Sequence, residues 1–212
     1  MDAPAERHLP LRERKKLRTR RALAHAAQEL FTRHGYDHVT LDRIAERAEV
    51  SRATFFRVYS SKEDVAIAAE KEFWAAYQQE LADHPPRGHL LRALRDALPT
   101  TLDHMSDDWE ARFLAGRRLA GTAPAVAAHS LQHCAERTRA ILTDLAALPG
   151  LPPARDLHLR LCLQAMLDAW HCAVDDWAAA ETPDRARLTA QITRAFDALP
   201  AALETTAAPP AD

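Results

Sequence analysis

An all-α fold is predicted by three features of this sequence. Glycine is scarce, with 5 among 212 residues, while alanine, leucine, arginine and the acidic residues dominate. No segment shows the strict apolar–polar alternation that marks a strand, whereas apolar residues recur at the three- and four-residue spacing of helices with one buried face. Hydrophobic residues make up 47% of the chain, which is enough for a sizeable core.

The first helix is predicted over 12–34, behind a flexible arm at 1–11 that contains Pro4 and Pro10. Gly35 suits a left-handed C-terminal cap of this helix. One face of the helix carries a regular apolar stripe made of Leu23, Ala27, Leu30 and Phe31.

Two short helices with a tight corner between them are predicted next, over 40–48 and 52–58. The apolar stripe of the first short helix is Leu41, Ile44, Ala45 and Ala48. The corner is Glu49-Val50-Ser51, in which Val50 points inward and Ser51 caps the following helix by accepting from its free N–H groups. A short helix that crosses a partner helix, with Arg52 and Thr54 at its start, has the layout that places side chains in a DNA major groove.

The remaining helices are predicted from caps and proline breaks. Ser61 is expected to cap a helix over 61–83, with acidic residues in its first turn. Pro99 is expected to bend or end the helix that follows. Further helices are expected over 88–104, 107–119, 123–148, 153–180 and 183–203, with a disordered tail at 205–212.

Charge is distributed unevenly along the chain. Residues 1–62 hold 14 Lys and Arg against 8 Asp and Glu, a net charge of +6, and residues 63–212 hold 14 against 22, a net charge of −8. A basic head attracts a polyanion such as DNA. The alternative is that the basic residues of the first helix only form a solvated face. The two short helices that follow favour DNA binding over this alternative.

The segment 12–66 resembles the TetR family of bacterial transcriptional regulators. The matching residues are Arg14–Arg21, Ala26–Phe31, Gly35-Tyr36, Thr40, Ile44-Ala45, Ala48–Ser51, Thr54–Tyr59 and Ser61-Lys62-Glu63. The resemblance implies a three-helix helix-turn-helix DNA-binding domain over 12–66. It also implies a helical domain over 67–204 that binds a small molecule and dimerises.

The resemblance also implies which residues meet DNA: Thr40, Ser51, Arg52, Ala53, Thr54, Phe56, Arg57 and Lys62. Arg52 suits guanine and Ala53 suits a thymine methyl group, while Thr40, Thr54 and Lys62 suit phosphates. Phe56 is expected either at base edges or in the core. Phe55 is expected in the core, and Tyr59 against the first helix.

Three residues depart from the family pattern. Glu49 replaces the usual glycine of the corner, which costs about 1 kcal/mol if that position has a positive φ. Phe56 and Val58 replace residues that supply polar groups to the DNA backbone in the family. DNA affinity is therefore expected to depend more on Arg57 and on the first helix.

The C-terminal part carries two long apolar stripes. One is Leu159, Leu163, Met166, Trp170, Val174 and Trp177, and the other is Leu188, Ile192, Phe196 and Leu199. Such helices pair with their symmetry mates in a homodimer, which would present two recognition helices to a palindromic operator. The alternative is an intrachain core.

A pocket for a small hydrophobic effector is expected in the C-terminal part. Its candidate residues are Trp74, Tyr77, His104, Trp109, Phe113, His133, Met166 and Trp170, for each of which ordinary core packing is the alternative. The segment from Arg117 to Ala125 resembles a subgroup common in actinobacterial regulators.

The function predicted from these features is a ligand-released repressor. An activator, a ligand-independent regulator and a metal- or thiol-sensing regulator stay open as alternatives, the last because His129, His133 and Cys134 lie close in sequence, as do His158 and Cys162. No metal or cofactor is predicted. No phosphate-binding loop, nucleophile elbow or dinucleotide motif is found, so an enzyme is not expected. The charged N-terminus and the absence of an 18-residue apolar run predict a cytoplasmic protein without membrane helices.

Overall fold

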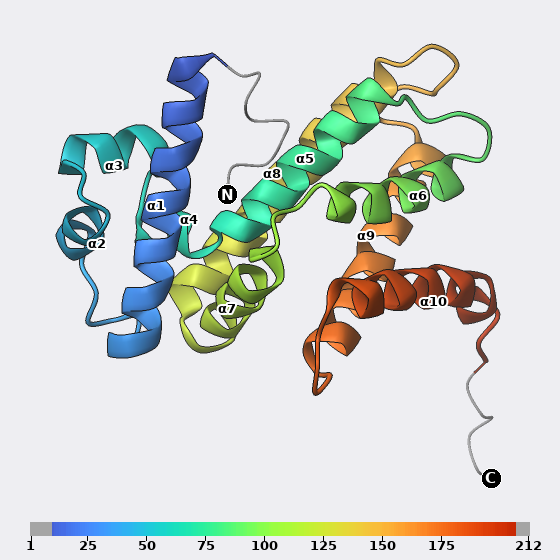
Figure 1. Cartoon of the computed structure of the whole chain (residues 1–212). Coiled ribbons are helices and arrows are strands. Elements are labelled where there is room, and N and C mark those ends of the chain that lie inside the picture. Colours follow the sequence, from blue (N-terminus) through green and yellow to red (C-terminus); the bar gives the residue numbers. More distant parts are fainter. Residues whose placement is uncertain (1–9, 207–212) are drawn as a thin grey trace, which may run out of the picture. The chain divides into compact units, whose positions relative to one another are not determined.

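The computed structural model (Figure 1) describes residues 10–206. These residues form two compact units. The first unit comprises 10–71 and 111–133, and the second comprises 72–110 and 134–206. No strand occurs between residues 10 and 206, so the all-α prediction is confirmed there. Most of the predicted arm and tail, residues 1–9 and 207–212, lies outside the described residues.

The first unit is built around a long helix that packs against three short ones. Its complete helices are α1 (Leu11–His34), α2 (Leu41–Arg47), α3 (Arg52–Val58) and α4 (Lys62–Ala66). It also holds the start of α5 (Ala68–Asp83), most of α7 (Trp109–Thr122) and the first half of α8 (Pro124–Ala146). Helices α2, α3 and α4 all contact α1.

The core of the first unit contains the apolar stripe predicted for α1. Leu23, Ala27, Leu30 and Phe31 are all buried, together with Ile44 of α2 and Phe55 of α3. Gly35 follows α1 with φ 78° and ψ 152°. Its φ is positive, as a glycine allows, but its ψ differs from that of the predicted left-handed cap.

The helix predicted over 61–83 is two helices, because Ile67 interrupts it. Ser61 caps α4 as predicted, accepting a hydrogen bond from the Asp64 backbone N–H at 3.1 Å. Ile67 is buried and takes a non-helical conformation (φ −99°, ψ 23°) before α5 begins at Ala68. Its side chain packs with Ala123 and Val126 in a small core of its own. The sequence contains no glycine or proline here, so the break has no local signal.

The second unit centres on α9. Its other elements are α6 (Leu90–Asp103), α10 (Arg185–Leu203), the second half of α8 and most of α5, and both α6 and α10 pack on α9 (Leu157–Ala178). Arg185, at the start of α10, is hydrogen-bonded to the first turn of α7 and to the segment before it. Its guanidinium donates to Glu110 Oε1 at 2.6 Å and to the carbonyls of Met105 and Ser106 at 3.1 and 3.0 Å.

Every residue of the stripe predicted on α9 is buried inside the single chain, and so are Leu188, Ile192 and Phe196 of α10. The α9 stripe and most of the α10 stripe therefore belong to an intrachain core, the alternative considered for them. A contact with a second copy would have to use other faces of these helices.

Two proline-based expectations differ from the structure. Pro99 does not end α6, which continues to Asp103 because Leu98 and Leu102 are fully buried on its inner face. The helix expected to stop at 119 runs to Thr122, so that Pro124 is the first residue of α8, a position where its missing N–H costs nothing. No helix between residues 10 and 206 is long and apolar enough to cross a membrane.

Candidate DNA-binding surface and its supporting network

Helix α3 places one set of side chains in the core and another in solvent. Ser51 caps it, its hydroxyl accepting from the Thr54 N–H at 3.1 Å, as predicted. Phe55 is fully buried, whereas Phe56 is 46% exposed, which excludes the core alternative for Phe56. We call the exposed residues Arg52, Ala53, Phe56 and Arg57 the recognition face.

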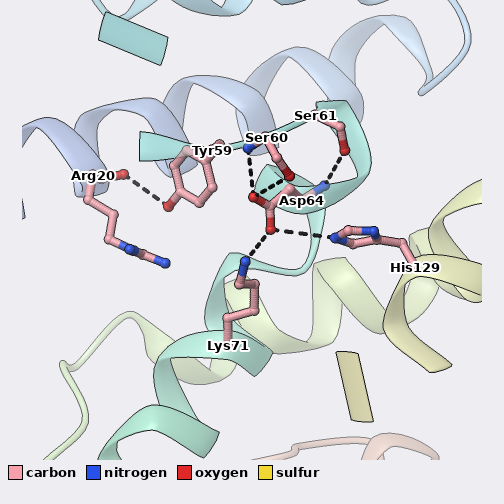
Figure 2. A network of polar contacts seen from close by, with 7 residues as sticks. All are labelled: Arg20, Tyr59, Ser60, Ser61, Asp64, Lys71 and His129. Atoms are coloured by element: carbon pink, nitrogen blue, oxygen red, sulfur yellow. Dashed lines mark hydrogen bonds and ion pairs between the residues drawn. The ribbon is translucent and has the colours of Figure 1, made fainter. Parts of the chain in front are cut away.

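Contacts between Tyr59, directly after α3, and Arg20 of α1 hold α3 against α1. The Tyr59 hydroxyl donates to the Arg20 carbonyl at 3.3 Å, and the Arg20 guanidinium lies 5.1 Å from the Tyr59 ring centroid (Figure 2). Tyr59 is 1% exposed, so the prediction that it closes the core against the first helix is confirmed.

The residues predicted at phosphates also have structural partners. Thr40 caps α2, its hydroxyl accepting from the Arg43 N–H at 3.3 Å. The Thr54 hydroxyl lies 3.0 Å from that of Ser51. The half-buried Lys62 donates to the Tyr36 carbonyl at 2.9 Å, and its ammonium lies 3.9 Å from the Tyr36 ring centroid. These contacts fix the loop after α1, and contact of these residues with phosphate stays a prediction.

The corner between α2 and α3 is strained at Glu49. This residue has a φ of 55°, the conformation that the usual glycine adopts freely. The Val50 N–H nevertheless bonds to the Ala45 carbonyl at 2.9 Å, which closes the turn. The φ of Glu49 is therefore positive, which is the condition under which the cost of about 1 kcal/mol is expected.

A basic groove runs between the first turns of α1 and the end of α3. It is lined by Leu11, Arg12, Glu13, Lys15, Lys16, Thr19, Arg57 and Val58. Four of these side chains are cationic and one is anionic. Such a groove attracts a phosphate backbone, as expected from the charge of the N-terminal segment.

Behind the surface, the buried Asp64 connects three elements (Figure 2). Its carboxylate accepts from the N–H and hydroxyl of Ser60 at 2.8 and 3.0 Å, and it forms an ion pair with Lys71 of α5. Nε2 of His129, on α8, lies 3.5 Å from the same carboxylate. We call Asp64, Ser60, Lys71 and His129 the Asp64 network. Burial alone would raise the pKa of Asp64, but the Lys71 and Ser60 contacts outweigh burial and lower it to about 2.

A second carboxylate of the first unit is held differently. Glu70 accepts a hydrogen bond from the Ser130 hydroxyl at 2.8 Å. Burial raises the pKa of Glu70 to about 7, although Ser130 and the charge of Arg117 act against this rise. Glu70 therefore changes charge near neutral pH inside the first unit.

In the second unit, six aromatic residues form one buried cluster: Phe73, Trp74, Tyr77, Trp109, Trp170 and Trp177. The Phe73 ring stacks on Trp170 with centroids 4.4 Å apart, and Trp109 stacks on Trp177 at 6.4 Å. The Tyr77 hydroxyl donates to the Leu94 carbonyl at 2.9 Å. We call this set the aromatic cluster.

The aromatic cluster contains four of the eight predicted effector residues: Trp74, Tyr77, Trp109 and Trp170. Met166 is fully buried in the second unit, whereas His104 is exposed at the end of α6. Phe113 and His133 are buried in the first unit. An effector-binding role for these residues stays a prediction.

The residues considered for metal or thiol sensing do not gather into a ligand set within the described chain. Among residues 10–206 no group of three or more His, Cys, Asp and Glu side chains could hold a metal ion. Cys134, Cys162 and Cys172 form no disulfide, and burial raises the pKa of Cys162.

Comparison with known proteins places this geometry in a family. The profile described as "Bacterial regulatory proteins, tetR family" matches residues 23–69. HTH-type transcriptional regulator TcmR of Streptomyces glaucescens is 30% identical over 207 residues, covering 93% of this chain and 92% of that protein. The chain belongs to the TetR family. It is therefore a DNA-binding transcriptional regulator, and the helix-turn-helix predicted from sequence is confirmed.

Other proteins are also similar to this chain. HTH-type transcriptional repressor AcnR of Corynebacterium diphtheriae is 27% identical over 137 residues, covering 65% of this chain and 68% of AcnR. The structure of SmeT, the repressor of the Stenotrophomonas maltophilia multidrug efflux pump SmeDEF, is 19% identical with a TM-score of 0.52, covering 86% of this chain and 89% of SmeT. Fatty acid degradation regulator FadR of Bacillus halodurans is 16% identical with a TM-score of 0.53, covering 89% of this chain and 97% of FadR. These two structures share the fold.

Sequence reasoning missed the polar groups behind the surface. Asp64, Lys71 and His129 come from three helices, and only the position of Asp64 in the first turn of a capped helix gave a local signal. Glu70 and Ser130 are 60 residues apart and gave none.

Proposed function

We propose that this TetR-family regulator is a homodimeric repressor that leaves a palindromic operator when a small hydrophobic effector binds. The observation that carries the DNA-binding part is the recognition face. Arg52, Ala53, Phe56 and Arg57 are exposed together on a helix that Phe55 and Tyr59 anchor in the core. The relatives named in the comparisons are transcriptional regulators, so we propose binding rather than catalysis as the activity, in the cytoplasm.

The proposed DNA contacts divide into two kinds. Arg52, Ala53 and Phe56 would meet base edges, because they project from the first turns of a major-groove helix. Thr40, Ser51, Thr54, Arg57 and Lys62 would lie along the phosphates, extended by the basic groove at the start of α1. The proposal that the protein represses rather than activates transcription is supported by the similar protein AcnR, which is named a transcriptional repressor.

Transmission of the effector signal would use the Asp64 network. Asp64 belongs to α4, and its partners Lys71 and His129 belong to α5 and α8, which both continue beyond the first unit. A change in either helix would therefore act on α4, which follows the recognition helix directly. A coupling free energy of about 1–3 kcal/mol gives a 5–150-fold change in operator affinity.

The operator can be found by footprinting the purified full-length protein on the DNA upstream of its own gene across a salt series. The proposal expects one protected palindrome and an affinity that falls steeply as salt rises, because phosphate contacts release counterions. The variant Arg52→Ala should lose the footprint while keeping its helical circular dichroism. Protection of a single asymmetric half-site by a monomer would contradict the dimeric reading.

Effector binding has a built-in reporter, because all four tryptophans belong to the aromatic cluster. Candidate compounds should be titrated while tryptophan fluorescence and operator binding are followed together. A compound that changes the fluorescence and weakens operator binding at the same concentration supports release by an effector. A compound that strengthens operator binding would instead support the activator or co-repressor alternative.

A further inference from the structure

The side chain of Arg52 is held from two directions across the corner of the helix-turn-helix. Its Nη1 donates to Asp42 Oδ2 at 3.3 Å, and its Cζ lies 5.6 Å from the Phe56 ring centroid. Asp42 lies in the first turn of α2, and Arg52 and Phe56 occupy consecutive turns of α3. The guanidinium is therefore placed by a carboxylate of one helix and a ring of the other.

This arrangement contributes little to stability. The side chains of Asp42 and Arg52 are 65% and 62% exposed, and ion pairs at such sites are weak because water and salt screen them. Its physical effect is on direction, since the two contacts restrict the rotamers of a long side chain. Asp42 engages one of the five N–H groups of Arg52, so the others stay available for the O6 and N7 atoms of a guanine.

Phe56 is placed for a different contact. Its ring meets the buried Phe55 edge-on, with centroids 5.7 Å apart and planes at 81°, while 46% of the residue stays exposed. Phenylalanine offers no hydrogen bond, so its exposed part suits the methyl group of thymine. Because the Phe56 ring and the Arg52 guanidinium are in contact, the two side chains would meet neighbouring base pairs, which are stacked about 3.4 Å apart.

We propose that Asp42 is a positioning residue that directs Arg52 to a guanine, and that Phe56 reads the methyl group of an adjacent thymine. Each head then recognises a thymine–guanine step. The inference rests on the proposed DNA-binding surface and adds to it a specificity residue on α2 that touches no base itself. A carboxylate near phosphates opposes binding to every sequence, so its contribution lies in discrimination between sequences.

The test starts from the site that the full-length protein selects from random duplexes. Affinities are then measured by fluorescence anisotropy at one salt concentration for the selected duplex and for duplexes changed at single positions. Replacing the guanine that Arg52 reads by adenine should weaken wild-type binding about 10-fold or more. Replacing the adjacent thymine by deoxyuridine, which removes only the methyl group, should weaken it about 3-fold.

The variants separate positioning from charge. Asp42→Asn should reduce the guanine preference to within about 2-fold while binding to unrelated DNA stays equal or becomes tighter. Glu46→Gln is the matched control, because it removes one negative charge from the same exposed face of α2, one turn further along. It should keep the guanine preference. Phe56→Ala should lose the deoxyuridine effect and keep the guanine preference.

The outcomes distinguish this inference from the function on which it rests. A wild-type protein that selects no sequence and binds all DNA equally would overturn both. If a palindrome is selected but Asp42→Asn and Glu46→Gln discriminate equally well, the positioning role is wrong and the DNA-binding function stands. If Arg52→Ala weakens binding to all duplexes by the same factor, Arg52 contacts phosphate and the thymine–guanine reading is wrong.

Discussion

The recognition face and the aromatic cluster use the same kinds of side chain in opposite ways. Phe56 of the recognition face is 46% exposed, although its neighbour Phe55 is fully buried. In the aromatic cluster Phe73 is fully buried and stacks on Trp170. The difference shows that the recognition face consists of side chains left outside the core, whereas the rings of the aromatic cluster fill a core.

The largest effect is expected from truncating the aromatic cluster. Phe73→Ala should lower the free energy of unfolding by about 3–5 kcal/mol, because a buried ring is removed and a cavity stays behind. Urea unfolding followed by circular dichroism measures it. Leu203→Ala, at a residue 88% exposed, is the control and should change stability by less than about 0.5 kcal/mol. A loss below about 1 kcal/mol for Phe73→Ala would mean that the cluster already contains an open, adaptable space.

The next largest effect concerns Glu70 of the first unit, whose buried carboxyl group makes the free energy of unfolding depend on pH. Because the folded pKa is raised to about 7, the folded protein binds a proton more tightly than the unfolded chain. This contribution is fully present below the unfolded pKa of about 4.5 and is lost as pH rises through 7, which amounts to about 3 kcal/mol. Unfolding free energies at pH 5 and pH 8 should therefore differ more in the wild type than in Glu70→Gln. Equal differences would show that Glu70 is ionised in the folded protein throughout.

The contribution of Asp64 to stability changes with pH in the opposite direction. Its folded pKa of about 2 lies below the unfolded value near 4, so its contribution is present above pH 4 and is lost as pH falls towards 2. Asp64→Asn should remove about 2 kcal/mol of stability at pH 7 and flatten the acid limb of the stability curve. Glu46→Gln, which changes an exposed carboxylate, should leave that limb intact. An acid limb that is unchanged in Asp64→Asn would contradict the assigned pairing with Lys71.

The smallest effect is a gain at the corner of the helix-turn-helix. Glu49→Gly should stabilise the protein by about 0.5–1 kcal/mol, because glycine adopts a φ of 55° without strain. Thermal unfolding at constant pH detects it, and Glu49→Ala serves as control, since it removes the charge but keeps the Cβ. An equal gain in stability in Glu49→Ala would show that the effect comes from the charge of Glu49 rather than from backbone strain.

Sequence reasoning worked well where one helix or one corner determines the result. The caps Ser51 and Ser61 follow from local spacing, and the buried Phe55 follows from the family resemblance of the same short segment. It failed where contacts join distant segments. The break at Ile67 has no glycine or proline to mark it in the sequence. Ile67 instead packs with Val126 of α8, a residue far away in the chain. The predicted effector residues could be named as large and apolar, but the arrangement of the aromatic cluster depends on how rings from α5, α9 and the start of α7 fill one volume.

Helix α4 has a consequence for motion. It has five residues, and an isolated helix of that length does not persist in water. Its order depends on the Ser61 cap and on the Asp64 network, so we expect it to open by local fluctuations at a lower free energy than the middle of α1. Amide hydrogens of residues 62–66 should accordingly exchange with solvent sooner than those in the middle of α1. The segment that directly follows the recognition helix would then regain its order only when α5 and α8 are in place, because the partners of Asp64 come from those helices.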